Sequence, residues 1–131
     1  MNESYKHSEL TEIIIKAFYE VYNKLGYGFL EKVYENALIV ELNKVGLIAK
    51  NQMPIDVYYD EVKVGVYFAD IVVEDLVIIE LKAAEVLVKE HEAQLTNYLR
   101  ATNIEVGLLL NLGKEPSVKR KVFSNHYKNH N

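Results

Sequence analysis

Cysteine is absent from the 131-residue sequence. Disulfides, zinc–thiolate sites, iron–sulfur clusters and thiol nucleophiles are therefore excluded. Long apolar runs are absent as well, because LVIIEL and VGLLLNL fall far short of the roughly 20 residues that a membrane-spanning helix needs. The start, MNESYKHSEL, has no apolar stretch of the kind that signal peptides carry. From these absences we expect a cytoplasmic protein with no membrane partner.

Charge of one sign does not dominate the chain, whose net charge is −4. This value argues against a general binder of polyanions. The charge is unevenly distributed, since residues 1–112 carry −8 and residues 113–131 carry +4. Electrostatic contact with nucleic acid is therefore expected to be local. The candidates lie in the C-terminal segment: Lys119, Arg120 and Lys121.

Length and composition predict one domain over residues 1–131. Half of the residues are apolar and 26% are charged, a globular balance that excludes a disordered or collagen-like chain. Apolar periodicity then assigns the elements. Helices are expected over 8–25, 30–45 and 88–102, strands over 53–59, 62–73, 76–82 and 104–110, and a short basic helix over about 117–126, in a basic tail that starts near 114.

The order of these elements predicts the architecture. Two helices precede three antiparallel strands, and a strand–helix–strand crossover places the last strand parallel to a neighbour. Pro54 favours either an edge position for the first strand or a place at the start of that strand. The expected fold class is α/β (α+β), with a mixed sheet flanked by helices. Gly26 and Gly28 predict a tight turn between the first two helices, and helical spacing places Leu30, Val33 and Tyr34 inward.

Two carboxylates are predicted to meet on neighbouring strands. If a three-residue loop is centred on Asp75, Asp70 lies opposite Glu80, with Cβ atoms roughly 4.5–5.5 Å apart. A two-residue loop would instead place Ala69 opposite Glu80 and leave Asp70 diagonal to it and close. Such a pair repels unless a proton or a cation lies between the groups. An oxygen-only site suits Mg²⁺ or Mn²⁺. Lys82 shares the strand face of Glu80 and is placed to activate a water or to stabilise charge on a phosphoryl group. A plain ion-pair network is the competing interpretation.

The pattern D-x9-E-x-K formed by Asp70, Glu80 and Lys82 resembles that of the PD-(D/E)XK nuclease superfamily. The predicted element order is similar to its restriction-endonuclease-like α-β-β-β-α-β core. Residues 28–34 read G-x-x-E-x-x-Y and resemble the signature of the GxxExxY family within that superfamily. Residues 91–102, HEAQLTNYLRAT, are also similar to that family, and the resemblance spans about 9–123.

The resemblance implies a nuclease site and a role for each matching residue. Asp70 and Glu80 would bind the metal, with the Leu81 carbonyl as a third ligand, and Lys82 would be the catalytic lysine. Glu31 matches an acid of the first core helix that supports the metal. Gln94 and Tyr98 match a Q-x-x-x-Y motif that helps to hold nucleic acid and the active site, although core packing of Tyr98 is the simpler alternative.

The function expected from these features is metal-dependent cleavage of DNA, and less readily of RNA. One alternative is a catalytically silent module on the same fold that binds nucleic acid or another protein. A second alternative is a structural dimer whose charged cluster is an ion-pair network. A homodimer or an unknown protein partner is left open by the sequence, and ten tyrosines in a small chain are compatible with a dimer.

Overall fold

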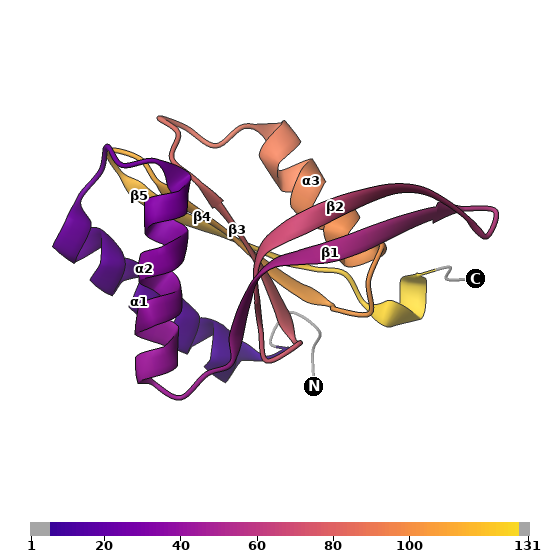
Figure 1. Ribbon diagram of the computed structural model, residues 1–131, viewed down its shortest axis with the longest axis horizontal. Coiled ribbons are helices and arrows are strands. Elements are labelled where there is room, and N and C mark those ends of the chain that lie inside the picture. The colour runs from indigo at the N-terminus through magenta and orange to yellow at the C-terminus, as the bar shows by residue number, and fades with distance from the viewer. Residues whose placement is uncertain (1–5, 129–131) are drawn as a thin grey trace.

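The computed structural model describes residues 6–128 and contains one five-stranded sheet with helices on both faces (Figure 1). Residues 1–5 and 129–131, which include the ends of the predicted domain and of the basic tail, lie outside the described part. The elements are α1 (Ser8–Leu25), α2 (Glu31–Lys44), β1 (Ala49–Tyr59), β2 (Val62–Val73), β3 (Val77–Lys82), α3 (Lys89–Arg100), β4 (Val106–Leu112), β5 (Pro116–Val122) and a 3-10 turn at Asn125–Tyr127.

The strands lie in the order β1-β2-β3-β4-β5. Strands β3 and β4 are parallel, as the crossover through α3 requires, and the other neighbours are antiparallel. Strand β1, which contains Pro54, is an edge strand as predicted. The run from α2 to β4 therefore has the α-β-β-β-α-β order and the mixed sheet of a restriction-endonuclease-like fold.

Two hydrophobic cores lie on opposite faces of the sheet. Helices α1 and α2 cover one face, where Ile79 and Leu81 of β3 join the core, while α3 covers the other, where Ile78 packs with Leu95 and Leu99. The alternation follows from the period of two along a strand. Every residue of β4 is buried, because this strand is covered on both faces. Within residues 6–128, no helix has the length and apolarity needed to cross a membrane.

The hairpin of β2 and β3 opens into a fork. Its ladder runs from Val73↔Val77 to Ile71↔Ile79, so the loop has three residues and the register is the predicted one. Beyond Ile71 the strands separate, since β2 continues with β1 as a projecting arm while β3 continues beside β4 (Figure 1). The turn at the tip of the arm places Asp60 and Glu61 at positive φ, as a tight hairpin turn requires.

The expected basic helix over 117–126 is wrong. Residues 116–122 form β5, which pairs antiparallel with β4 from Leu112↔Pro116 to Val106↔Val122. Val118 and Val122 are four residues apart, a spacing that fits one face of a helix and equally one face of a strand. Both pack against the core under α1 and α2, so burial of β-branched side chains beside a long apolar strand decides in favour of the sheet.

Candidate active site

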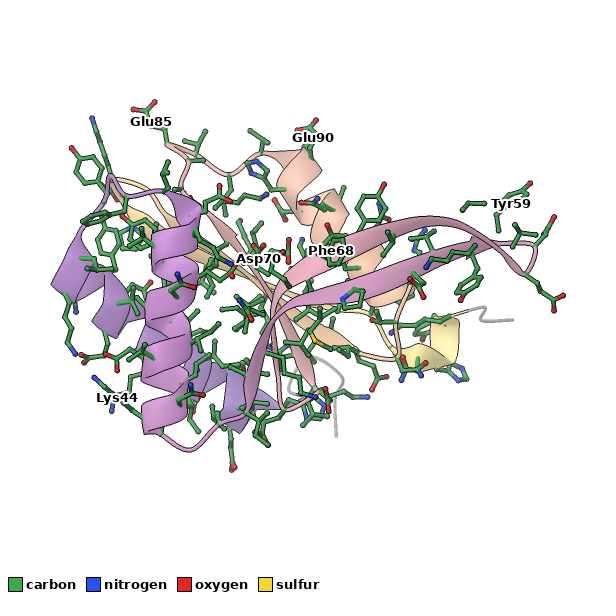
Figure 2. All side chains as sticks on the ribbon, in the orientation of Figure 1. Lys44, Tyr59, Phe68, Asp70, Glu85 and Glu90 are labelled. Carbon is green, nitrogen blue, oxygen red and sulfur yellow. The ribbon has the colours of Figure 1, made fainter. Side chains whose placement is uncertain are left out.

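Asp70 lies at the fork between β2 and β3 (Figure 2). Glu80 lies opposite it, one step beyond the Ile71↔Ile79 pair. Each carboxylate accepts a hydrogen bond from the backbone of the opposite strand. The amide of Asp70 donates to Glu80 Oε2 at 2.8 Å, and the amide of Leu81 donates to Asp70 Oδ2 at 2.8 Å. Where the ladder stops, the two side chains therefore take over backbone donors that would otherwise lack partners.

The environment of this pair favours a proton or a cation between the carboxylates. Glu80 is only 4% exposed, and burial, followed by the charge of Asp70, raises the pKa of Glu80 to about 8. Burial also raises the pKa of Asp70, against the hydrogen bond from the Leu81 amide, which lowers it. Near neutral pH the pair therefore retains a proton that two solvated carboxylates would have lost.

Lys82 ends β3 two residues after Glu80 and on the same strand face. It is half-buried, and its charge lowers the pKa of both carboxyl groups. The chain after Lys82 is fixed by Asn111 of β4. The buried amide of Asn111 accepts from the Ala84 N–H at 3.0 Å and donates to the Ala84 carbonyl at 2.9 Å. The lysine is thus held at the end of a rigid strand rather than on a free loop.

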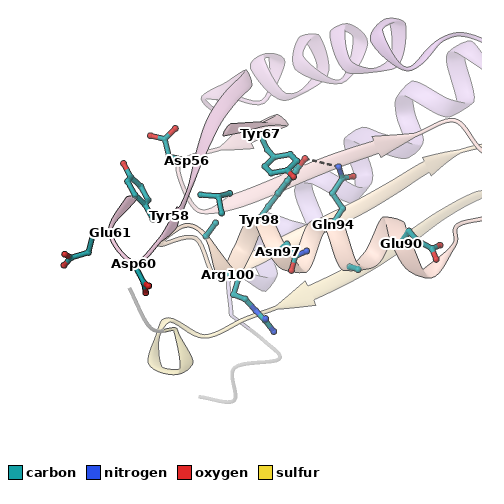
Figure 3. A pocket seen from close by; sticks show the side chains of 13 residues that line it. Asp56, Tyr58, Asp60, Glu61, Tyr67, Glu90, Gln94, Asn97, Tyr98 and Arg100 are labelled. Carbon is teal, nitrogen blue, oxygen red and sulfur yellow. Dashed lines mark hydrogen bonds between the residues drawn. The ribbon is translucent and has the colours of Figure 1, made fainter. Parts of the chain in front are cut away.

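Helix α3 contributes Gln94 and Tyr98 from one face. Gln94 Nε2 donates to the Tyr98 hydroxyl at 3.0 Å (Figure 3). Burial and the charges of Glu80 and Asp70 raise the pKa of Tyr98 to about 12, so the phenol stays protonated. Tyr98 also packs in the core under α3, as the simpler alternative predicted. Both residues line a hollow of about 710 Å³ between α3 and the β1–β2 arm.

The acids of α2 lie close to the pair without joining it. Glu31 is exposed at the start of α2, and its charge raises the pKa of both Asp70 and Glu80. The sequence pattern passes over Glu35, one turn later, which is buried and accepts from Gln52 Nε2 at 2.9 Å and from Asn51 Nδ2 at 3.3 Å. Its salt bridge with Lys32 is 2.7 Å long. The sequence feature that could have identified Glu35 as buried is its position between Tyr34 and Leu38 on the buried face of α2.

The carboxylates at this site can be compared with the number of protein ligands that a hard cation such as Mg²⁺ requires. Over residues 6–128, no group of three or more His, Cys, Asp and Glu side chains is placed to hold one ion. Mg²⁺ is commonly bound by only one or two carboxylates, with water and substrate phosphate completing its coordination. Two opposed carboxylates with raised pKa values fit that requirement, because a cation would replace the retained proton.

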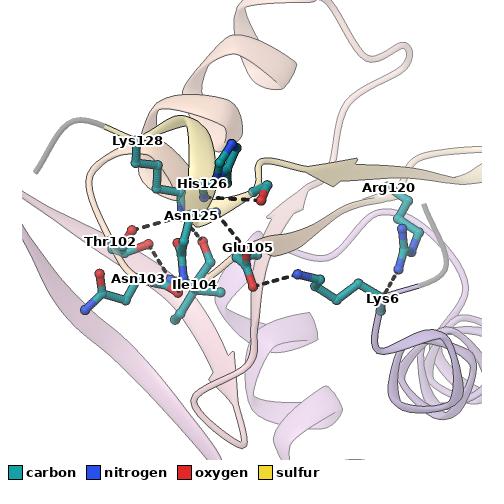
Figure 4. A network of polar contacts seen from close by, with 10 residues as sticks. Lys6, Thr102, Asn103, Ile104, Glu105, Arg120, Asn125, His126 and Lys128 are labelled. Atoms are coloured by element: carbon teal, nitrogen blue, oxygen red, sulfur yellow. Dashed lines mark hydrogen bonds and ion pairs between the residues drawn. The ribbon is translucent and has the colours of Figure 1, made fainter. Parts of the chain in front are cut away.

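The three predicted basic residues do not form a single cluster. Lys121 makes a 2.6 Å salt bridge with Glu92 of α3, and Lys119 is exposed on the same face of β5. Arg120 lies on the opposite face, where its guanidinium donates to the carbonyl of Lys6 (Figure 4). Because successive side chains of a strand point to opposite faces, β5 separates Arg120 from Lys119 and Lys121. A tail or a helix could have presented all three together.

Comparisons with known proteins identify the fold family. The model of the PD-(D/E)XK nuclease superfamily matches residues 8–122. The crystal structure of SSO0001 is similar, with a TM-score of 0.56 and 19% identity over 93% of this chain. At that identity the likeness concerns the fold alone, and this chain spans 62% of the length of SSO0001. No curated protein matches the chain.

Proposed function

The chain belongs to the PD-(D/E)XK nuclease superfamily, and from that premise we propose that it is a metal-dependent nuclease whose site is Asp70, Glu80 and Lys82. The G-x-x-E-x-x-Y motif and the α3 sequence place it, in this proposal, in the GxxExxY branch. The observation that carries the proposal is the opposed carboxylate pair at the fork, in which Asp70 is part-buried and Glu80 is buried with its pKa raised to about 8, and a lysine lies two residues after Glu80.

In the proposed reaction, Asp70 and Glu80 would hold Mg²⁺ or Mn²⁺, with the Leu81 carbonyl as a further oxygen donor. When bound, such an ion would supply positive charge for a phosphate oxygen and would lower the pKa of a water. Lys82 orients that water and stabilises the negative charge that develops on the phosphoryl group. Tyr98, protonated at neutral pH, donates a hydrogen bond toward the phosphate, and Gln94 orients the phenol. Glu31 takes a supporting role through its charge.

The expected substrate is DNA, and less readily RNA. Within the proposal, Lys119, Arg120 and Lys121 add attraction for the phosphate backbone. That contribution is modest, because Lys121 is paired with Glu92 and Arg120 donates to Lys6. Affinity for nucleic acid arises mostly from phosphate neutralisation. A homodimer or an unknown protein partner therefore remains part of the proposal as a source of further contacts with the substrate.

A second candidate function is a catalytically silent module that binds nucleic acid. One observation favours it: the carboxylates of Asp70 and Glu80 already satisfy backbone donors at the fork. This structural role alone would account for the two carboxylates in a protein that catalyses no reaction. The two candidates make opposite predictions about metal-dependent cleavage.

The proposal is tested by incubating the protein with single-stranded, duplex and branched DNA and with RNA, in Mg²⁺ or Mn²⁺. We expect cleavage of at least one substrate that stops when the metal is chelated. Lys82→Ala and Asp70→Asn should each lower the rate by at least about 100-fold, because Lys82 would stabilise the charge on the reacting phosphate and Asp70 would hold the metal. Lys44→Ala is the matched control and should leave the rate within about twofold, since this exposed lysine ends α2, far from Asp70 (Figure 2).

Absence of metal-dependent cleavage on every substrate, with binding retained, would support the silent module instead. Cleavage that survives Lys82→Ala and Asp70→Asn at the wild-type rate would place the chemistry elsewhere or in a contaminant. Each variant is checked by its melting temperature, because Asp70 also accepts the Leu81 amide.

A further inference from the structure

The loop between α1 and α2 exposes large apolar side chains beside the candidate active site. Tyr27 is 57% exposed, Phe29 46% and Leu30 81%. Together with Gly26 and Gly28 these residues are called the platform loop below. Helical spacing had placed Leu30 inward, but it precedes α2 and points to solvent. Three large exposed apolar groups within four residues form a candidate binding surface.

The platform loop is rigid because Tyr34 holds it. The buried hydroxyl of Tyr34 donates to the Gly26 carbonyl at 2.6 Å and accepts from the Phe29 N–H at 3.2 Å. The rings of Phe29 and Tyr34 pack edge to face with centroids 6.1 Å apart. Gly26 and Gly28 have φ values of 69° and 113°, which other residues rarely adopt. The tyrosine of the G-x-x-E-x-x-Y motif thus fixes the backbone that presents Tyr27 and Leu30.

The platform loop forms one wall of a hollow of about 470 Å³ at the carboxyl ends of the parallel strands β3 and β4. The opposite walls are also fixed. The Tyr22 hydroxyl lies 2.7 Å from the carbonyls of Gly113 and Lys114, and Asn111 holds Ala84. A Cβ at Gly113 would clash with the Ala84 carbonyl oxygen. Because these walls are already fixed by hydrogen bonds, they lose little conformational entropy when a ligand binds.

The hollow lies beside the candidate active site. Glu31 lines it, and the charge of Glu31 raises the pKa of Asp70 and of Glu80. Ala83, the residue after Lys82, lines it as well. Its charges are acidic rather than basic on balance, since two carboxylates, Glu31 and Glu85, accompany one lysine, Lys114. A ligand that extends from the carboxylate pair into this hollow therefore gains little from charge and must gain from contact with the aromatic and apolar loop.

We propose that the platform loop is a stacking surface for unpaired nucleobases, so that the substrate is a nucleic-acid strand with bases exposed next to the scissile phosphate. This inference rests on the proposed function for the position of that phosphate. Aromatic side chains stack on any base face, and each such contact is worth about 1–3 kcal/mol when the side chain is truncated to alanine. The bases of a continuous duplex stack on one another and leave no face for Tyr27, so single strands and unpaired ends are preferred to duplex.

The test measures binding without cleavage, in EDTA, by fluorescence anisotropy. The probes are a labelled oligothymidylate of about 12 nucleotides, an abasic deoxyribose-phosphate strand of the same length, and a duplex. The abasic strand keeps the phosphates and lacks only the bases. We expect the wild type to bind the oligothymidylate at least about fivefold more tightly than either other probe.

The variants separate stacking from other causes. Tyr27→Ala should weaken oligothymidylate binding about fivefold or more and leave abasic binding unchanged, while Tyr27→Phe keeps the wild-type affinity. The matched control is Tyr59→Ala at the far end of the arm, a tyrosine that is more exposed than Tyr27 at 71%, and this variant should bind as the wild type does. Melting temperatures confirm that each variant is folded.

Several results would overturn the proposal: no detectable binding of the oligothymidylate, equal affinity for the abasic strand, or unchanged affinity in Tyr27→Ala. The same experiments distinguish failure of the stacking proposal from failure of the proposed nuclease function. Base-dependent binding through Tyr27 in a protein that cleaves nothing would keep the stacking surface and reject the nuclease. Cleavage by a protein whose binding ignores Tyr27 would do the reverse.

Discussion

At the scale of single residues, the charge state of Glu80 is the main property of the site. Its carboxyl is buried against Asp70, and its pKa of about 8 lies well above the ordinary value of 4.5. Over the pH range between these two values the folded protein holds a proton that the unfolded chain has lost. A raised pKa of this kind stabilises the folded state at low pH and ceases to do so as pH rises through 8.

Glu80→Gln is expected to change how stability depends on pH. In the wild type, this group lowers the free energy of unfolding as pH rises from about 4.5 to about 8, by up to about 1.4 kcal/mol per pH unit. The variant cannot lose a proton there, so its stability should fall less over that range. Urea denaturation at several pH values measures the difference, and identical slopes for the two proteins would show that Glu80 has no raised pKa.

Tyr34→Phe is expected to lower the free energy of unfolding by about 1–3 kcal/mol. The substitution removes only the hydroxyl and leaves the Gly26 carbonyl and the Phe29 N–H without their partner. Tyr27→Phe removes a hydroxyl from an exposed ring and is the matched control, with a change within about 0.5 kcal/mol. Chemical denaturation compares them. Equal stability of Tyr34→Phe and the wild type would mean that the platform loop is not held by this contact.

The sequence alone predicted the pairing of Asp70 with Glu80, because the loop centred on Asp75 sets a register that the strand period then extends. It could not predict the carboxylate–amide hydrogen bonds, which depend on β2 leaving β3 at the fork. The contacts of Glu35 were not predicted from the sequence for a related reason. Its partners Asn51 and Gln52 come from the start of β1, which begins at Ala49 and not at residue 53 as predicted.

At the scale of secondary-structure elements, β5 is the clearest departure from expectation. A pattern with Val118 and Val122 on one face and lysines between them suits a helix and a strand alike. The long apolar strand β4 decides the outcome, because its outer edge needs backbone partners and β5 supplies them. The platform loop is a similar case, since helical spacing counts Leu30 as inward while the turn at Gly28 places it in solvent.

Hydrogen exchange can distinguish the strand from the predicted helix. Strand β5 is an edge strand, so alternate amides between Ser117 and Val122 bond to β4 and the others face solvent. We expect slow exchange at every second amide. A helix would instead protect consecutive amides after its first turn. Uniform protection, or uniformly fast exchange, over this segment would contradict the strand.

At the scale of the whole molecule, the fold places two kinds of surface around one pair of carboxylates. The hollow between α3 and the arm presents Gln94 and Tyr98, and the hollow behind the platform loop presents Tyr27 and Leu30. The net charge of −4 is compatible with a polyanionic substrate because a bound cation would offset Asp70 and Glu80. The order of elements, and with it this arrangement, could be predicted from periodicity and crossover rules.

The central claim is that Asp70 and Glu80 form a cation site in which a metal replaces a proton. Calorimetric titration of Mn²⁺ at pH 7, repeated in buffers of different ionisation enthalpy, counts the protons released per ion bound. With a Glu80 pKa of about 8, binding should release close to one proton, and Glu80→Gln should release almost none or fail to bind. Mn²⁺ that does not bind, or that binds the wild type and Glu80→Gln with equal affinity and no proton release, would contradict the account.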